Sequence, residues 1–135
     1  MTVRELSRYY NLRKYVDQLE REIKTLEANA LSAVNLDPMP KGRGGVNRAS
    51  EDTALSLAKL KRTVARERAK AMREYVKLDA YISTIPDITV KRIFRYRYCE
   101  CLKWEEVARS MGPGYTMEAV KKRHYRYIKG EKRGG

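Results

Sequence analysis

The chain has 135 residues, of which 42% are hydrophobic, which is enough for one small domain with an extension but not for two full cores. Its 30 Lys and Arg residues outnumber 17 Asp and Glu residues, so the formal net charge is +13 and an anionic partner is expected. No apolar run of membrane-spanning length, signal peptide or lipidation motif is visible, which favours nucleic acid over a membrane. The alternative is a basic protein that its charge merely keeps soluble.

The first expected element is a long helix over residues 3–33. Its apolar residues are spaced alternately three and four apart, which is typical of a coiled-coil seam. The opposite face carries charges of both signs, and we interpret it as a solvated surface. The seam consists of Tyr9, Leu12, Val16, Leu19, Ile23, Leu26 and Ala30.

A segment rich in Pro and Gly, residues 35–48, follows this helix. Such a composition is not expected to continue a helix, and we interpret the segment as a mobile connector. Ser50 is the expected N-cap of the next helix, because a hydroxyl followed by Glu51 and Asp52 suits the unpaired N–H groups and the dipole at a helix start.

The second long helix is expected to end near Ser83 and to fold back on the first as an antiparallel hairpin. Its outer face between Lys59 and Lys77 is strongly basic. That face is either a set of phosphate contacts or, as is more common for a charged helix face, only solvated. We also expect the long helices to support a homo-oligomer. The apolar stripe consists of Leu57, Leu60, Val64, Ala71, Tyr75, Leu78 and Ile82.

Residues 85–130 are expected to form a three-helix unit that folds around its own small core. The predicted fold is therefore all-α, with a helical arm over residues 1–84 before this unit and a basic flexible tail over residues 131–135. Pro86 ends the second long helix, and Asp87 can cap the next one. The inner side of that helix carries Val90, Ile93, Phe94 and Tyr98.

The run from Trp104 to Ile128 has the pattern of a helix-turn-helix DNA reader. A short helix with an apolar face ends at Gly112, a Pro-Gly turn follows, and Thr116 is a good N-cap for a basic second helix. A helix presented in this way, N-terminus first, fits the major groove. The residues expected in the core are Trp104, Val107, Ala108, Met111, Val120, Tyr127 and Ile128.

Cys99 and Cys101 are two residues apart, which turns them about 200° from each other around a helix and disfavours a disulfide. His124 is the one histidine, so a zinc site would have too few ligands. We expect reduced thiols in a cytoplasmic setting, with no metal and no cofactor. His124 is expected at the surface or at the edge of the core.

Several segments resemble the C-terminal half of the ArpU/RinA-type phage regulators, which resemble region four of sigma factors. These segments are Ile85 to Asp87, Arg92 to Tyr98, Leu102 to Ala108, Met111-Gly112 and Thr116 to Ile128. Where such sequences commonly carry Gly and a Ser or Thr cap, this chain has Cys101 and Lys103. Lys103 has no side-chain acceptor, so we expect the first turn of its helix to be less stable by about 1 kcal/mol.

The resemblance implies a transcription regulator, either an activator or a repressor, of late or packaging genes of a phage in a bacterial host cell. Double-stranded DNA and host RNA polymerase are the implied partners. In such a regulator Thr116 would bind a DNA phosphate, and Arg126 and Lys129 would contact the DNA backbone. Arg123 would point partly inward. Lys122 suits guanine and Glu118 suits cytosine N4, although Glu118 equally suits simple stabilisation of a helix start. The residues expected to face base edges are Met117, Glu118, Ala119, Lys121 and Lys122.

Two other classes of protein are the alternatives. A small terminase subunit, which reads a phage packaging site and assembles into a ring, would share nearly every feature above. An enzyme is disfavoured, because the sequence has no phosphate-cradling Gly loop, no metal-binding His spacing and no acidic triad. We therefore expect no catalytic residues.

Overall fold

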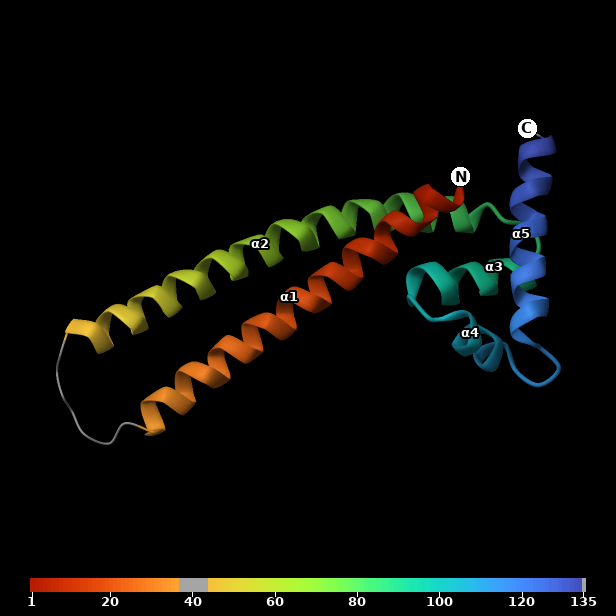
Figure 1. Cartoon of the computed structure of the whole chain (residues 1–135). Helices are drawn as coiled ribbons and strands as arrows, with labels where there is room; N and C mark the ends of the chain where they lie inside the picture. Colours follow the sequence, from red (N-terminus) through yellow and green to blue (C-terminus); the bar gives the residue numbers. More distant parts are fainter. Residues whose placement is uncertain (37–43, 135) are drawn as a thin grey trace. The chain divides into compact units, whose positions relative to one another are not determined.

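The computed structural model describes residues 1–36 and 44–134, and all of the regular structure in these residues is helical (Figure 1). The all-α fold with a long N-terminal hairpin is therefore confirmed. No helix in the described part of the chain combines the length and apolar character needed to cross a membrane. The helices are α1 (Val3–Leu36), α2 (Gly44–Ser83), α3 (Ile88–Phe94), the π-helix η1 (Arg95–Cys99), α4 (Trp104–Met111) and α5 (Met117–Gly134).

The chain divides into two compact units, and α1 and α2 contribute to both. We call residues 14–69 the hairpin unit, and residues 1–13 together with residues 70–134 the multi-helix unit. The multi-helix unit thus takes in both ends of the hairpin as well as the 85–130 range that the sequence suggested for a separate domain. It also has helical backbone up to Gly134, where a flexible tail was expected.

In the hairpin unit, α1 and α2 pack antiparallel along the predicted apolar seam. Val16 and Leu19 of α1 are buried against Val64 of α2, with Ile23 and Leu60 partly buried beside them. Ion pairs cross the seam at its edges, between Glu20 and Arg68 and between Glu27 Oε2 and Lys61 Nζ at 3.7 Å. The apolar contacts of the seam carry most of the packing between the two helices, because exposed ion pairs such as these contribute only about 0–1 kcal/mol each.

The helices extend further into the predicted connector than expected. α1 continues to Leu36 and α2 begins at Gly44, well before the N-cap predicted at Ser50, which lies inside the helix. That prediction was wrong because glycine in a helix costs only about 1 kcal/mol relative to alanine and does not forbid the conformation. The remainder of the predicted connector, residues 37–43, lies outside the described residues.

One core of the multi-helix unit joins the hairpin ends to the C-terminal helices. Leu6 of α1 and Leu78 and Ile82 of α2 are buried in the same cluster as Phe94, which is fully buried, and Ile128 of α5. The predicted interior position of Phe94 is confirmed. Residues 85–130 therefore do not enclose this core alone, because three of its buried side chains come from the hairpin ends.

A second core lies among α3, α4 and α5. Val107 and Val120 are fully buried, and Ala108 and Met111 complete the apolar face of α4 as predicted. Trp104 is half-buried at the edge of this cluster. Since burying a large aliphatic side chain contributes roughly 1.5–3 kcal/mol, these contacts are sufficient to fix α5 on α4.

Asp87 caps α3 as predicted, accepting from the backbone N–H groups of Thr89 at 2.8 Å and Val90 at 3.3 Å. The helix does not stay α-helical to its end, however. From Arg95 to Cys99 it widens into a π-helical turn, closed by the bond from Glu100 N–H to the Arg95 carbonyl at 3.0 Å. Such turns insert an extra residue into the helical repeat and re-aim the side chains around it.

The cysteines do not share a helix as the sequence analysis assumed. Cys99 ends η1, whereas Cys101 is buried in the following link with a φ of 58°, in the left-handed region. Both carry a reduced thiol, and burial raises the pKa of the Cys99 thiol to about 11. At Lys103, the N-cap of α4, Glu106 Oε1 accepts from the backbone N–H at 3.0 Å, so part of the missing cap is supplied from within the helix.

Candidate nucleic-acid interface

Two glycines shape the turn between α4 and α5. Gly112 ends α4 with a φ of 109°, and Gly114 has a φ of 91°, values that L side chains rarely adopt. Thr116 then caps α5, accepting from the Ala119 N–H at 3.1 Å as predicted. The turn therefore presents the N-terminal end of α5 at the end of a short, tightly defined link.

Residues four apart line the inward side of α5. Val120, His124 and Ile128 are buried, and Tyr127 is half-buried beside them. The predicted inward positions of the apolar residues are thus confirmed. His124 was placed wrongly, at the surface or the core edge, although its spacing of four from both neighbours was a signal that it belongs to the same buried stripe.

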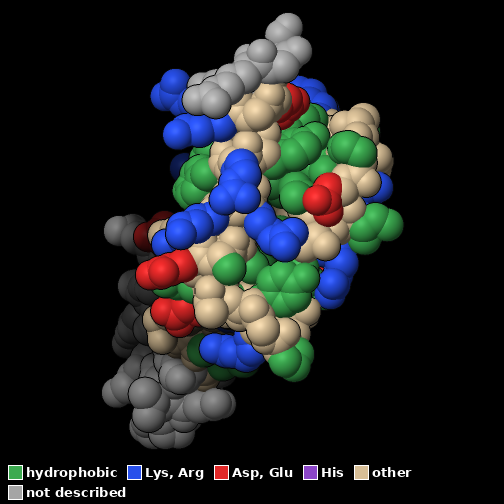
Figure 2. Space-filling model, turned by 90° about the vertical axis from the view of Figure 1, so that its right-hand side faces the viewer, with side chains coloured by type: hydrophobic (Ala, Val, Ile, Leu, Met, Phe, Trp, Pro, Cys, Tyr) green, Lys and Arg blue, Asp and Glu red, His purple; other side chains and the backbone are tan. Residues whose placement is uncertain are grey.

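The opposite side of α5 is a shallow basic groove. Figure 2 views the side of the molecule on which α5 lies and shows Lys and Arg side chains gathered over the middle of that face. Four cations and one carboxylate belong to the groove, so its potential is positive. Its lining residues are Glu118, Lys121, Lys122, Tyr125, Arg126, Lys129 and Gly130.

The structure brings most of the predicted site residues together in this groove, but not all of them. Arg123 is exposed rather than partly inward, and with Arg126 it lines a neighbouring groove that also contains Asp87 and Glu131. Met117 and Ala119 are half-buried at the start of α5 and line neither groove.

Sequence reasoning missed Tyr125 as a groove residue. Its side chain is 47% exposed in the middle of the basic groove, and its ring centre lies 4.5 Å from that of His124 and 6.4 Å from that of Trp104. The Tyr125 ring therefore packs against the rings of His124 and Trp104 on its inner side, while its outer part faces solvent. An aromatic ring held in this way can contact an apolar base edge such as the thymine methyl group.

Buried polar and aromatic contacts fix the rotation of α5 about its own axis. His124 is fully buried, and its Nε2 forms a 2.5 Å hydrogen bond with the hydroxyl of Tyr98. Burial, and secondarily the charge of Arg97, lowers the pKa of His124 to about 4, so the ring is neutral at pH 7. Its Nδ1 has no hydrogen-bond partner among the described residues. A buried polar group is costly to move, so the bond with Tyr98 holds one orientation of the helix.

Near His124, Arg97 contacts two aromatic rings. Its guanidinium carbon lies 4.7 Å from the centre of the Trp104 ring and 5.0 Å from that of Tyr10, and its Nη1 donates to the Leu102 carbonyl at 2.9 Å. Stacking on two aromatic faces is a geometry that suits arginine and not lysine. The first turns of α1 are thereby tied to the start of α4.

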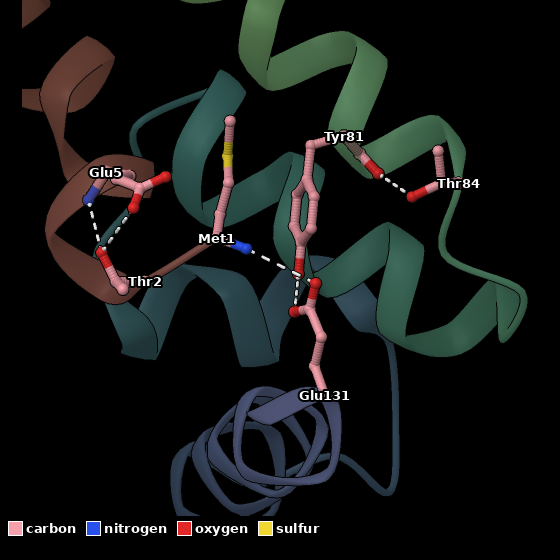
Figure 3. A network of polar contacts seen from close by, with 6 residues as sticks. All are labelled: Met1, Thr2, Glu5, Tyr81, Thr84 and Glu131. Carbon is pink, nitrogen blue, oxygen red and sulfur yellow. Dashed lines mark hydrogen bonds and ion pairs between the residues drawn. The ribbon is translucent and has the colours of Figure 1, made fainter. Parts of the chain in front are cut away.

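The far end of α5 is held by a small polar network (Figure 3). Glu131 accepts a hydrogen bond from the Tyr81 hydroxyl of α2, and its Oε1 lies 3.4 Å from the amino group of Met1. Burial and the Glu131 carboxylate raise the pKa of Tyr81, which therefore stays protonated as the donor. Thr2, nearby, caps α1 by accepting from the Glu5 N–H at 3.2 Å.

No cluster of three or more His, Cys, Asp or Glu side chains able to hold a metal ion occurs among the described residues. Comparison of the chain with protein-family models, with curated proteins and with solved structures found no match. The function must therefore be inferred from the geometry and charge of the groove.

Proposed function

We propose that the chain is a sequence-specific DNA-binding regulator that reads the major groove with α5. The observation that carries this proposal is the basic groove on the outward face of a helix presented by a glycine turn from a short preceding helix. Helix-turn-helix proteins dock in this way, with base contacts near the N-terminal part of the second helix and phosphate contacts around it.

The polar groups of the groove match the donors and acceptors of base edges. Lys121 and Lys122 can donate to guanine O6 and N7, and Glu118 can accept from cytosine N4. Arg126 and Lys129, one to two turns further along, suit phosphate contact. Thr116 is exposed at the start of α5, and the N-terminal end of the helix at this residue would bind a phosphate.

We further propose, from the resemblance to ArpU/RinA-type regulators, that the genes controlled are late or packaging genes of a phage. The protein would act in the cytoplasm of the bacterial host, as an activator that works with host RNA polymerase. Pairing of the long helices between two copies would then place two readers on one operator.

The test is selection of binding sites from a random duplex library with the full chain. We expect a defined consensus to be enriched, and we expect it to be lost when Lys121 and Lys122 are both changed to Ala. A library that stays random after repeated rounds, with binding still present, would contradict sequence-specific reading.

The mass of the protein in solution separates this proposal from a small terminase subunit. A regulator is expected as a monomer or dimer by light scattering. A stable ring of eight or more subunits, with the selected site lying at a packaging start, would support the terminase function instead.

A further inference from the structure

We propose that the hairpin unit carries a second DNA-binding surface, which grips the phosphate backbone of duplex DNA through Lys59, Arg62 and Arg66 of α2. This inference goes beyond the proposed function, because these residues belong to a different unit from α5 and read no bases.

The three side chains share one face of α2. At 100° per residue, positions 59, 62 and 66 lie within about 60° of one another around the helix. All three are exposed, whereas Leu60 and Val64, which point toward α1, are partly or fully buried. The surface therefore faces away from the apolar seam of the hairpin.

These cations are not engaged by the carboxylates of the hairpin. Lys61 and Arg68, which flank the seam, are paired with Glu27 and Glu20 of α1. Lys59 and Arg62 make no ion pair with any described residue, and Arg66 Nη2 donates a 3.4 Å hydrogen bond to the Thr63 hydroxyl. Their charge is thus available to an anion from outside the unit.

The two helices of the hairpin differ sharply in charge. Over residues 14–31, α1 mixes three cations with four carboxylates, whereas over residues 53–69 α2 has five cations and the single carboxylate of Glu67. The positive potential of the hairpin unit is consequently concentrated on α2. The exposed side chains of Ala58, Ala65 and Ala69 on this helix are short, which allows a backbone to approach closely.

The spacing of the cations suits duplex DNA. From Lys59 to Arg66 the helix rises about 10 Å. This length corresponds to about three base-pair steps at 3.4 Å each, so neighbouring cations are roughly one to two steps apart along one strand. An anionic membrane is the less suitable partner, because a helix that lies on a membrane buries a face of large apolar side chains. Among the described residues of α2 in the hairpin unit, Leu55 is the one large apolar side chain that is exposed.

The test compares two charge-matched double variants of the full chain. Lys59→Gln with Arg62→Gln removes one Lys and one Arg from the proposed surface. Lys24→Gln with Arg21→Gln removes the same residue types from exposed positions of α1 in the same unit. Binding to a mixed-sequence duplex without the selected operator is measured as a function of salt, with helicity by circular dichroism as the check on folding.

We expect the slope of log K against log salt to become shallower by about 2 units in the α2 variant, because each phosphate contact contributes about 0.9. The α1 variant should keep the slope of the unaltered chain. An equal reduction in both variants would mean that only net charge matters, and an unchanged slope in both would mean that the hairpin does not contact DNA; either result overturns the proposal.

Binding of the same variants to vesicles containing phosphatidylserine is measured to distinguish a lipid surface from DNA as the anionic partner. Loss of vesicle binding without loss of duplex binding in the α2 variant would overturn the proposal in favour of a lipid surface. This test is independent of base reading by α5. Mixed-sequence DNA contains no selected operator, so the change in slope can be measured even if the chain enriches no consensus.

Discussion

The hydroxyl of Tyr98 and Nε2 of His124 lie 2.5 Å apart in the interior of the multi-helix unit, joining η1 to α5. The contact is made from the inward side of the same helix whose outward side forms the basic groove. A change at His124 therefore acts on the orientation of the groove without altering any residue in it.

Acid should destabilise the protein through His124. Its pKa is about 4 in the folded state against an ordinary 6.5, so below pH 6.5 the unfolded chain binds more protons than the folded one. The contribution of the neutral ring is fully present above pH 6.5 and is lost as the pH falls toward 4, by about 3 kcal/mol. Urea unfolding of the parent and of His124→Gln across this range measures it, and the same pH dependence in both proteins would refute the assignment.

Charge reversal at Lys121 and Lys122 should abolish specific DNA binding and leave the fold intact, because neither side chain contributes to a core. Each lost base contact is expected to cost about 1–3 kcal/mol of binding free energy. Binding to the selected operator by fluorescence anisotropy measures the loss. Arg4→Glu with Arg8→Glu, at exposed positions of α1 in the same unit, is the control, and unchanged operator affinity in the Lys121 and Lys122 variant would rule out the groove.

Val107→Asp or Val120→Asp should unfold the segment formed by α4 and α5. Both positions are fully buried, and a carboxylate there would have no partner, at a cost of several kcal/mol. The chemical-shift dispersion of residues 85–130 reports the result. Ser110→Asp, on the exposed side of α4, should retain the dispersion; native-like spectra for the buried variants would show that the packing of α4 on α5 is different.

Leu78→Ala and Ile82→Ala should each destabilise the multi-helix unit by about 2–5 kcal/mol, although both lie outside residues 85–130. The reason is that these side chains fill the same core as Phe94 and Ile128. Chemical denaturation followed by the fluorescence of Trp104 is the measurement. Val76→Ala, exposed on the same helix, should have little effect, and equal stability of all three variants would indicate that the C-terminal helices form their core alone.

Periodicity predicted the elements of this fold well, because helix faces are encoded locally. The seam through Val16 and Val64, the cap at Asp87 and the turn at Gly112 follow from residue spacing and from backbone preferences. The start of α2 could not be predicted, since the penalty for glycine at Gly44 is too small to decide a boundary. The π-turn at η1 has no signal in the spacing of the apolar residues. Arg95, its first residue, forms a 2.9 Å ion pair with Asp79 of α2, a tertiary contact that no local pattern records.

The candidate site was predicted in outline for the same reason. A cap at Thr116 and a basic helix sufficed to place Lys121, Lys122 and Arg126 in one groove. Tyr125 was missed because an aromatic residue in a helix is more often buried, and its exposure depends on how His124 occupies the core. The sharing of one core with Leu6 and Ile82 is a long-range contact that spacing along the chain cannot reveal.

The division of α1 and α2 between two units makes the multi-helix unit discontinuous in sequence, with residues 14–69 inserted between its parts. Joining residues 1–13 to residues 70–134 in an unstructured chain requires closing a long loop, whereas the antiparallel hairpin closes through local contacts. Once the hairpin has formed, the two ends of residues 14–69 are already neighbours. The conformational entropy of closing the loop has then already been lost. Substitutions at Val16 or Val64 should therefore slow the assembly of the multi-helix unit, although they lie in neither of its cores.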